Sequence, residues 1–216
     1  MFDFFKRAQL TRKGLSCGKT RRKHLQSEFW DTLRCNPGVG LGLFVSAFIG
    51  ITVLLRILGA NLPQAAGANF IFTAAVFLPA AVHWYLSLPA DVRPNGHVLL
   101  VFCAVVLHLA AVGVVLSYGH HRGWPPDYSL LLAPHALAPI ILCMLAGRRI
   151  AIFGAAYATL LGSCLVPHSS ILPFIATGLS VGFVGVFVTQ RIRRRSRLLT
   201  SGLYIGGMAT VFMVLF

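Results

Sequence analysis

Histidine is the residue type in this sequence with the widest choice of chemistry. Imidazole binds metal ions and carries protons near neutral pH. Five of the eight histidines map to the middle or outer half of the predicted membrane-spanning region: His108, His120, His121, His135 and His168. Asp91 and Asp127 lie in or beside polar loops, and no acidic residue lies well inside an apolar segment. A metal site or proton path is one hypothesis, and the alternative is a set of interfacial or hydrogen-bonded histidines that serve the structure.

The other reactive residue types favour no enzyme class. No Walker-type phosphate loop and no HExxH motif occurs, and five acidic residues leave little material for paired-carboxylate catalysis. Reduced thiols are expected, because no CxxC pair and no zinc-ligand spacing occurs among Cys17, Cys35, Cys103, Cys143 and Cys164. We therefore predict no catalytic, cofactor-binding or metal-binding residue in this chain.

The composition indicates a membrane protein. Of 216 residues, 56% are hydrophobic and 11% are charged, with a mean hydropathy of +0.77. A soluble domain carries about 25% charged residues. The predicted fold is all-α, a polytopic membrane helical bundle. Residues 1–36 are too polar and too basic for a cleavable signal peptide, so the first span is expected to be retained.

The apolar segments define about seven transmembrane helices. Each span needs about 20 apolar residues. The predicted spans are about 40–58, 69–88, 98–118, 128–146, 150–166, 171–189 and 198–216. The chain therefore divides into a basic cytoplasmic arm, residues 1–37, and a transmembrane domain, residues 38–216. Pro134 and Pro139 are expected to be tolerated inside the fourth span, because neighbouring groups in a bundle can bond the carbonyls that a proline frees.

The basic residues predict the orientation of the chain. With the N-terminus in the cytoplasm, 17 of the 19 Lys and Arg residues fall on the cytoplasmic side, and only Arg56 and Arg122 do not. Nucleic-acid binding is not expected from the net charge of +14, since no aromatic platform accompanies the basic residues. Contacts with anionic lipid headgroups are expected instead, in particular from Arg148, Arg149, Arg191, Arg193, Arg194, Arg195 and Arg197.

Small residues in the sixth predicted span indicate close helix packing. Gly178 and Gly182 form a GxxxG pair, and Gly185 follows. Such residues allow two helix backbones to approach each other closely. Packing within the monomer is the favoured interpretation, and a homo-oligomer is the alternative.

Several motifs in residues 128–207 form a pattern. They are Leu132-Ala-Pro-His-Ala-Leu-Ala-Pro139, the Gly147-Arg-Arg turn, and Arg191-Ile-Arg-Arg-Arg-Ser-Arg-Leu-Leu-Thr-Ser-Gly-Leu203. A second stretch is the basic arm from Phe4-Phe-Lys-Arg to Gly18-Lys-Thr-Arg-Arg-Lys23. Together these stretches resemble the bacterial seven-transmembrane HD-domain phosphohydrolases, which are membrane-bound cyclic-di-AMP phosphodiesterases. The resemblance covers about two thirds of the chain.

The resemblance implies a specific architecture. In that family a first span leads to an extracytoplasmic domain, and a seven-span membrane domain precedes a cytoplasmic, metal-dependent HD domain. Here ten residues, 59–68, separate the first two predicted spans, and the sequence contains no His-Asp dipeptide. The predicted spans number seven in total, one short of the family pattern. We therefore expect a chain truncated before the HD domain and lacking the extracytoplasmic domain, so no catalytic residue is carried over.

The expected function follows from this resemblance. The chain is expected to be a membrane anchor or signal sensor in the bacterial inner membrane, with no hydrolytic activity of its own. A separate cytoplasmic catalytic protein is one expected partner. The alternative is a transporter or channel for a small solute or ion, because prolines in the second and fourth spans are compatible with broken helices around a solute.

Overall fold

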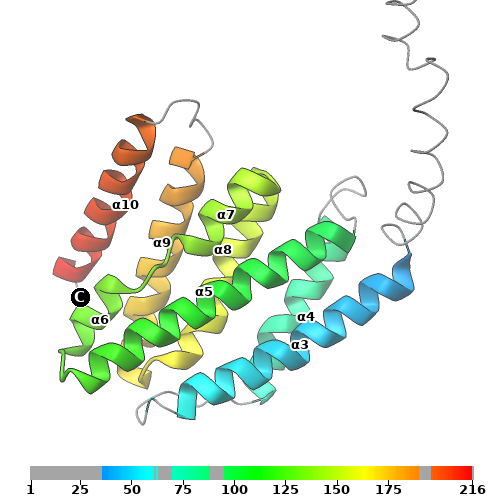
Figure 1. Ribbon diagram of the computed structural model, residues 1–216, viewed down its shortest axis with the longest axis horizontal. Coiled ribbons are helices and arrows are strands. Elements are labelled where there is room, and N and C mark those ends of the chain that lie inside the picture. The colour runs from blue at the N-terminus through cyan, green and yellow to red at the C-terminus, as the bar shows by residue number, and fades with distance from the viewer. Residues whose placement is uncertain (1–35, 61, 63–69, 88–94, 190–195, 216) are drawn as a thin grey trace, which may run out of the picture.

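The computed structural model describes residues 36–60, 62, 70–87, 95–189 and 196–215 (Figure 1). Within these ranges every regular element is a helix, so the predicted all-α fold is confirmed. The basic arm up to residue 35 lies outside the described residues. The α-helices are α3 (Pro37–Ala60), α4 (Phe70–Ser87), α5 (Asn95–His121), α6 (Pro126–Leu132), α7 (Leu137–Leu145), α8 (Arg148–Gly162), α9 (Ile171–Thr189) and α10 (Ser196–Leu215). Two short 3-10 helices, η2 (Ser163–Leu165) and η3 (His168–Ser170), connect α8 to α9.

Each predicted span coincides with a helical segment. Four segments among the described residues are long and apolar enough to cross a membrane: Gly38–Ala60, Asn95–His121, Asp127–Leu145 and His168–Thr189. They correspond to the first, third, fourth and sixth predicted spans. The second span corresponds to a shorter apolar helix, Phe70–Leu86. The fifth and seventh spans correspond to α8, with 15 residues, and α10, with 20 residues.

Helix α3 shows how the outer surface of the bundle is composed. Ile51 and Leu55 face inward and are buried. On another face, residues spaced by four are all exposed: Leu41, Val45, Ile49, Val53 and Ile57. A surface helix of a soluble protein would carry polar residues at such positions. An apolar outer face is the pattern required of a helix that lipid acyl chains surround.

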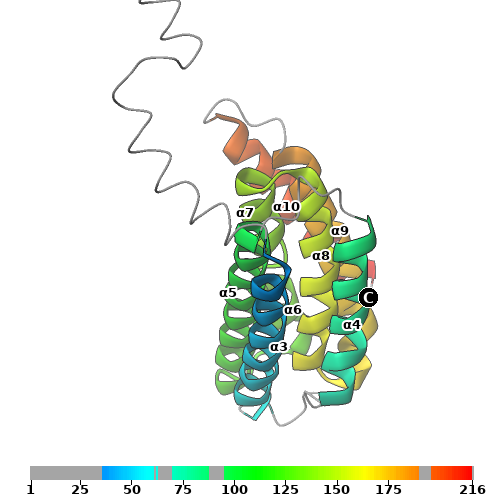
Figure 2. The ribbon, with the colours of Figure 1, turned by 90° about the vertical axis from the view of Figure 1, so that its right-hand side faces the viewer.

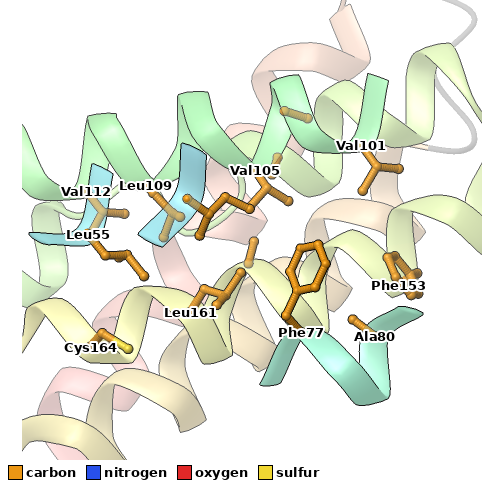
Figure 3. Packing of buried hydrophobic residues seen from close by; sticks show 14 of the residues in the cluster. Leu55, Phe77, Ala80, Val101, Val105, Leu109, Val112, Phe153, Leu161 and Cys164 are labelled. Atoms are coloured by element: carbon orange, nitrogen blue, oxygen red, sulfur yellow. The ribbon is translucent and has the colours of Figure 1, made fainter. Parts of the chain in front are cut away.

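The helices pack mainly against their neighbours in the chain (Figures 1 and 2). Helix α7 packs on α8, α8 on α9 and α9 on α10, whereas α3 packs on α5. Helix α4 packs on α3 and α8, and its Phe77 ring stacks on the Phe102 ring of α5. One continuous apolar core joins α3, α4, α5 and α8. Figure 3 shows Phe77, Val105 and Leu161 pointing into this interior from three of these helices.

The fourth predicted span differs from a single helix, because it is broken between α6 and α7. Ala133 is extended, with φ −61° and ψ 132°, as the residue before a proline prefers. Pro134 has no amide hydrogen for the carbonyl four residues earlier, and its ring would clash with that turn of helix. Pro139 does not interrupt α7, because it is the third residue of that helix, where an amide has no partner within the helix.

Candidate functional site: buried histidines at a broken helix

The break between α6 and α7 places a histidine side chain in the interior of the bundle. His135 is 2% exposed, and its Nε2 donates a hydrogen bond to the Leu130 carbonyl over 3.0 Å. In a continuous helix this carbonyl would accept from the amide of residue 134, which is a proline. The imidazole therefore supplies the hydrogen that Pro134 lacks. Because a carbonyl only accepts, Nε2 carries the proton and Nδ1 is left as an acceptor.

Helices α8 and α9 enclose the His135 ring. It packs edge-to-face with the ring of Phe174, with centroids 4.9 Å apart and an interplanar angle of 64°. Gly178 of α9 lies beside it. A Cβ at position 178 would come within 2.5 Å of Thr159 Cγ2 and 3.2 Å of His135 Nδ1. The close approach of α9 to the histidine therefore requires a glycine at this position.

His108, on α5, is the second histidine of the cluster. Its side chain is fully buried, and it interacts electrostatically with His135 and with the backbone of Pro134. Among the described residues, neither ring nitrogen of His108 has a hydrogen-bond partner, and neither does Nδ1 of His135. A buried polar atom left without a partner costs about 1–3 kcal/mol. These three buried nitrogens can therefore form further hydrogen bonds in the interior of an otherwise apolar bundle.

The chemistry available at this cluster is polar recognition. Two imidazoles can donate and accept hydrogen bonds with a water or with another small neutral molecule. Within the described residues, no group of three or more His, Cys, Asp or Glu side chains is arranged to hold a metal ion. Broken helices are also the places where membrane proteins bind polar solutes or change conformation.

The other histidines that were considered from the sequence lie elsewhere. His120 and His121 are exposed at the end of α5, with ring centroids 6.1 Å apart. His168 is exposed in η3. Of the five histidines named above, the structure therefore brings together only His108 and His135 in the buried cluster.

The predicted headgroup-binding arginines are described only in part. Arg148 and Arg149 are exposed in the first turn of α8, directly after Gly147, whose φ of 92° permits the tight turn from α7. The guanidinium carbon of Arg148 lies 4.5 Å from the centroid of the Phe187 ring. Arg197 lies in α10, and nothing is described of its side chain. The remaining residues, Arg191, Arg193, Arg194 and Arg195, lie outside the described residues.

The three predicted packing glycines lie along one side of α9, against other helices of the same chain. Gly178 adjoins Thr159 of α8. At Gly182 a Cβ would lie 3.2 Å from that of Ala155 and 3.4 Å from Pro139 Cγ. Gly185 adjoins Ala136, Ile140 and Ile205, with 3.4 Å to the Ala136 Cβ. The α9 backbone therefore lies close to both α7 and α8.

Two polar side chains of α8 were not anticipated from the sequence. Thr159 is buried beside Gly178, and the Tyr157 hydroxyl is hydrogen-bonded to His83 Nδ1 over 3.2 Å, which links α8 to α4. Their polarity within an apolar span was the signal that could have identified them. Their partners come from other helices, and a single-span pattern does not specify those partners.

The comparisons with known proteins identify the family. A family model described as a 7TM receptor with intracellular HD hydrolase matches residues 64–216, which include α4 to α10 and the buried histidines. No curated protein and no solved structure gives a significant match. Helix α3 precedes the matched residues, yet it packs on α5 and contributes to the same core. The chain belongs to the family of seven-transmembrane receptors with an intracellular HD hydrolase, and the matched residues correspond to its membrane region.

Proposed function

We propose that this chain is the membrane anchor or sensor region of a bacterial signalling protein, acting on a cytoplasmic HD phosphodiesterase that hydrolyses cyclic-di-AMP. The observation that carries this proposal is the family match over residues 64–216. The HD hydrolase belongs either to the same protein or to a separate cytoplasmic partner. Hydrolysis is assigned to that HD domain, because the sequence of this chain contains no His-Asp dipeptide.

The proposed orientation has the N-terminus in the cytoplasm of the bacterial inner membrane. Asn95 Nδ2 donates to the Asn36 carbonyl over 3.0 Å, so the first residues of α3 and α5 lie at one end of the bundle. Helix α8 begins at the same end with Arg148 and Arg149, whereas Arg122 lies after α5 at the opposite end (Figure 1). Of the 19 Lys and Arg residues, 17 lie in the segments that we assign to the first end, and only Arg56 and Arg122 do not, which supports a cytoplasmic assignment and contact with anionic headgroups there.

The buried histidines provide a place where a signal could change the bundle. Pro134 interrupts the span, and one hydrogen bond from His135 replaces the missing backbone hydrogen bond. A change at His108 or His135 would therefore alter the contact of α6 and α7 with α5 and α9. A sensor requires such a bistable element, whose balance a signal can shift.

The orientation is tested by cysteine labelling in intact cells. Arg148→Cys and Arg122→Cys are introduced separately into a cysteine-free chain and treated with a membrane-impermeant maleimide. We expect position 122 to be labelled in intact cells and position 148 only after permeabilisation. The opposite pattern would contradict the proposed orientation.

The signalling role is tested with the purified chain in proteoliposomes. We expect no hydrolysis of cyclic-di-AMP by the chain alone. An HD domain from this family, either fused to the chain or added to the vesicles, is expected to hydrolyse cyclic-di-AMP. Its rate should differ between vesicles with the chain and vesicles without it. Hydrolysis by the chain alone would contradict the proposal. So would an HD domain that hydrolyses cyclic-di-AMP at the same rate with and without the chain. Solute or ion flux through the same vesicles would favour the transporter alternative.

A further inference from the structure

A small apolar cavity lies between α4 and α5, flanked by α3 and α8. Its volume is about 30 Å³. Figure 3 shows residues of three helices that line it: Phe77 and Ala80 of α4, Val101 and Val105 of α5, and Phe153 and Leu161 of α8. Helix α4 packs more extensively on α3 and α8 than on α5, which leaves the cavity between α4 and α5.

The cavity opens toward the outside of the bundle. Its lining residues are buried except for Phe102 and Tyr157, which are partly exposed, and we place the mouth beside these two residues. The rings of Phe77 and Phe102 stack across the space between α4 and α5, with centroids 5.9 Å apart. An aromatic pair at this position can move to admit a thin apolar group, since side-chain rotation is fast on the timescale of binding.

The surface of the cavity excludes a polar occupant. All of its accessible surface is apolar. A water molecule in a protein interior needs two to four polar partners, and it would find none there. An empty void is also unfavourable, because the side chains around it lose dispersion contacts. A hydrocarbon group is therefore the occupant that matches this surface.

The surroundings of the mouth supply such a group. Leu78 and Val82 of α4 and Leu99 and Val106 of α5 are exposed on the outer surface, so lipid acyl chains surround the two helices that frame the cavity. One water-sized group requires about 10–15 Å³ of such space, so 30 Å³ accommodates about two groups of that size. This is the size of the end of an acyl chain and not of a whole lipid.

We propose that this cavity binds the terminal carbon atoms of a membrane-lipid acyl chain, which enters from the bilayer beside Phe102 and Tyr157. The hydrogen bond between Tyr157 and His83 holds α8 and α4 together at 3.2 Å, so an inserted chain fills the space between α4 and α5 without separating α4 from α8. Acyl-chain binding needs neither the HD domain nor a signal, so it is independent of the proposed function.

The experiment uses the full chain, purified in detergent with a phosphatidylglycerol that carries a diazirine at the end of one acyl chain. After irradiation, peptide mass spectrometry identifies the labelled residues. Lipid at the outer surface reaches exposed residues such as Leu78 and Val106. Only a chain inside the cavity reaches buried residues such as Phe77 and Leu161. We expect labelling of both groups in the wild-type chain.

Two neighbouring substitutions on α5 provide the matched comparison. Val105→Phe fills the cavity, and we expect labelling of Phe77 and Leu161 to fall about tenfold, equivalent to about 1.4 kcal/mol of binding free energy. Val106→Phe adds the same side chain on the exposed face and should leave that labelling unchanged. Ala80→Leu fills the cavity from α4 and should repeat the loss if the first variant fails to fold.

Labelling confined to exposed residues in the wild-type chain would overturn the proposal. So would equal labelling of Leu161 in Val105→Phe and Val106→Phe. Failure of the HD-domain assay with retained labelling of Leu161 would instead overturn the proposed function and leave the acyl-chain site standing.

Discussion

Replacing His135 tests whether its ring takes the place of the amide hydrogen that Pro134 lacks. The substitution His135→Leu keeps an apolar side chain of similar size and removes the donor to the Leu130 carbonyl. His135 is 2% exposed, so water does not reach the carbonyl freely. A buried polar group left unpaired costs about 1–3 kcal/mol. We expect a loss of about 2 kcal/mol in unfolding free energy, which lowers the Tm by about 4–8 °C for a chain of this size.

Two further variants separate the hydrogen bond from packing. His135→Gln retains a donor and should be more stable than His135→Leu. Pro134→Ala restores an amide hydrogen at the position where a continuous helix would donate to the Leu130 carbonyl. In the His135→Leu background, Pro134→Ala should therefore recover most of the lost stability.

The assay is thermal unfolding in detergent, followed with a thiol-reactive fluorophore. Cys164 is 3% exposed, so a chain in which it is the sole cysteine reacts when the bundle opens. Equal Tm values for His135→Leu and His135→Gln would refute the assignment of the hydrogen bond. A further fall in Tm on adding Pro134→Ala to His135→Leu would refute the explanation of the helix break.

Three other predictions use the same chain. Gly178→Ala should lower the unfolding free energy by about 1–3 kcal/mol in the same thermal assay, because the added Cβ would meet Thr159 and His135. Gly206→Ala is the control and should be nearly neutral, because no described atom lies within 4 Å of a Cβ at that position. His108→Leu should leave the Tm unchanged or raise it, because neither ring nitrogen of His108 has a hydrogen-bond partner among the described residues. A fall in Tm as large as that of His135→Leu would contradict this prediction. Substituting both Arg148 and Arg149 by Ala should weaken binding of anionic lipid to the bundle by about 1 kcal/mol per residue, measured as the ratio of anionic to neutral phospholipid that copurifies with the chain at low salt. An unchanged lipid ratio would argue against headgroup contact.

Helix class and approximate helix position follow from local patterns. Long apolar runs between polar turns predicted the spans, and each contains a helix, because a chain in hydrocarbon must satisfy its backbone hydrogen bonds within the segment. The α6–α7 break was less predictable. A proline inside a span is compatible with a kinked helix or with a break, and the outcome depends on the groups that bond the freed carbonyl. Here His135 supplies that bond.

The candidate site was identified from the sequence only as a set of separate histidines. The sequence alone determined that His108 and His135 lie within apolar spans and that no carboxylate accompanies them, because both facts depend on residue type and order. Only the tertiary structure decided that these two interact, that His120, His121 and His168 lie exposed elsewhere, and that Gly178 lies against His135. The physical reason is that helix periodicity describes the faces of one helix, whereas contacts between helices depend on how several apolar faces pack against one another at once.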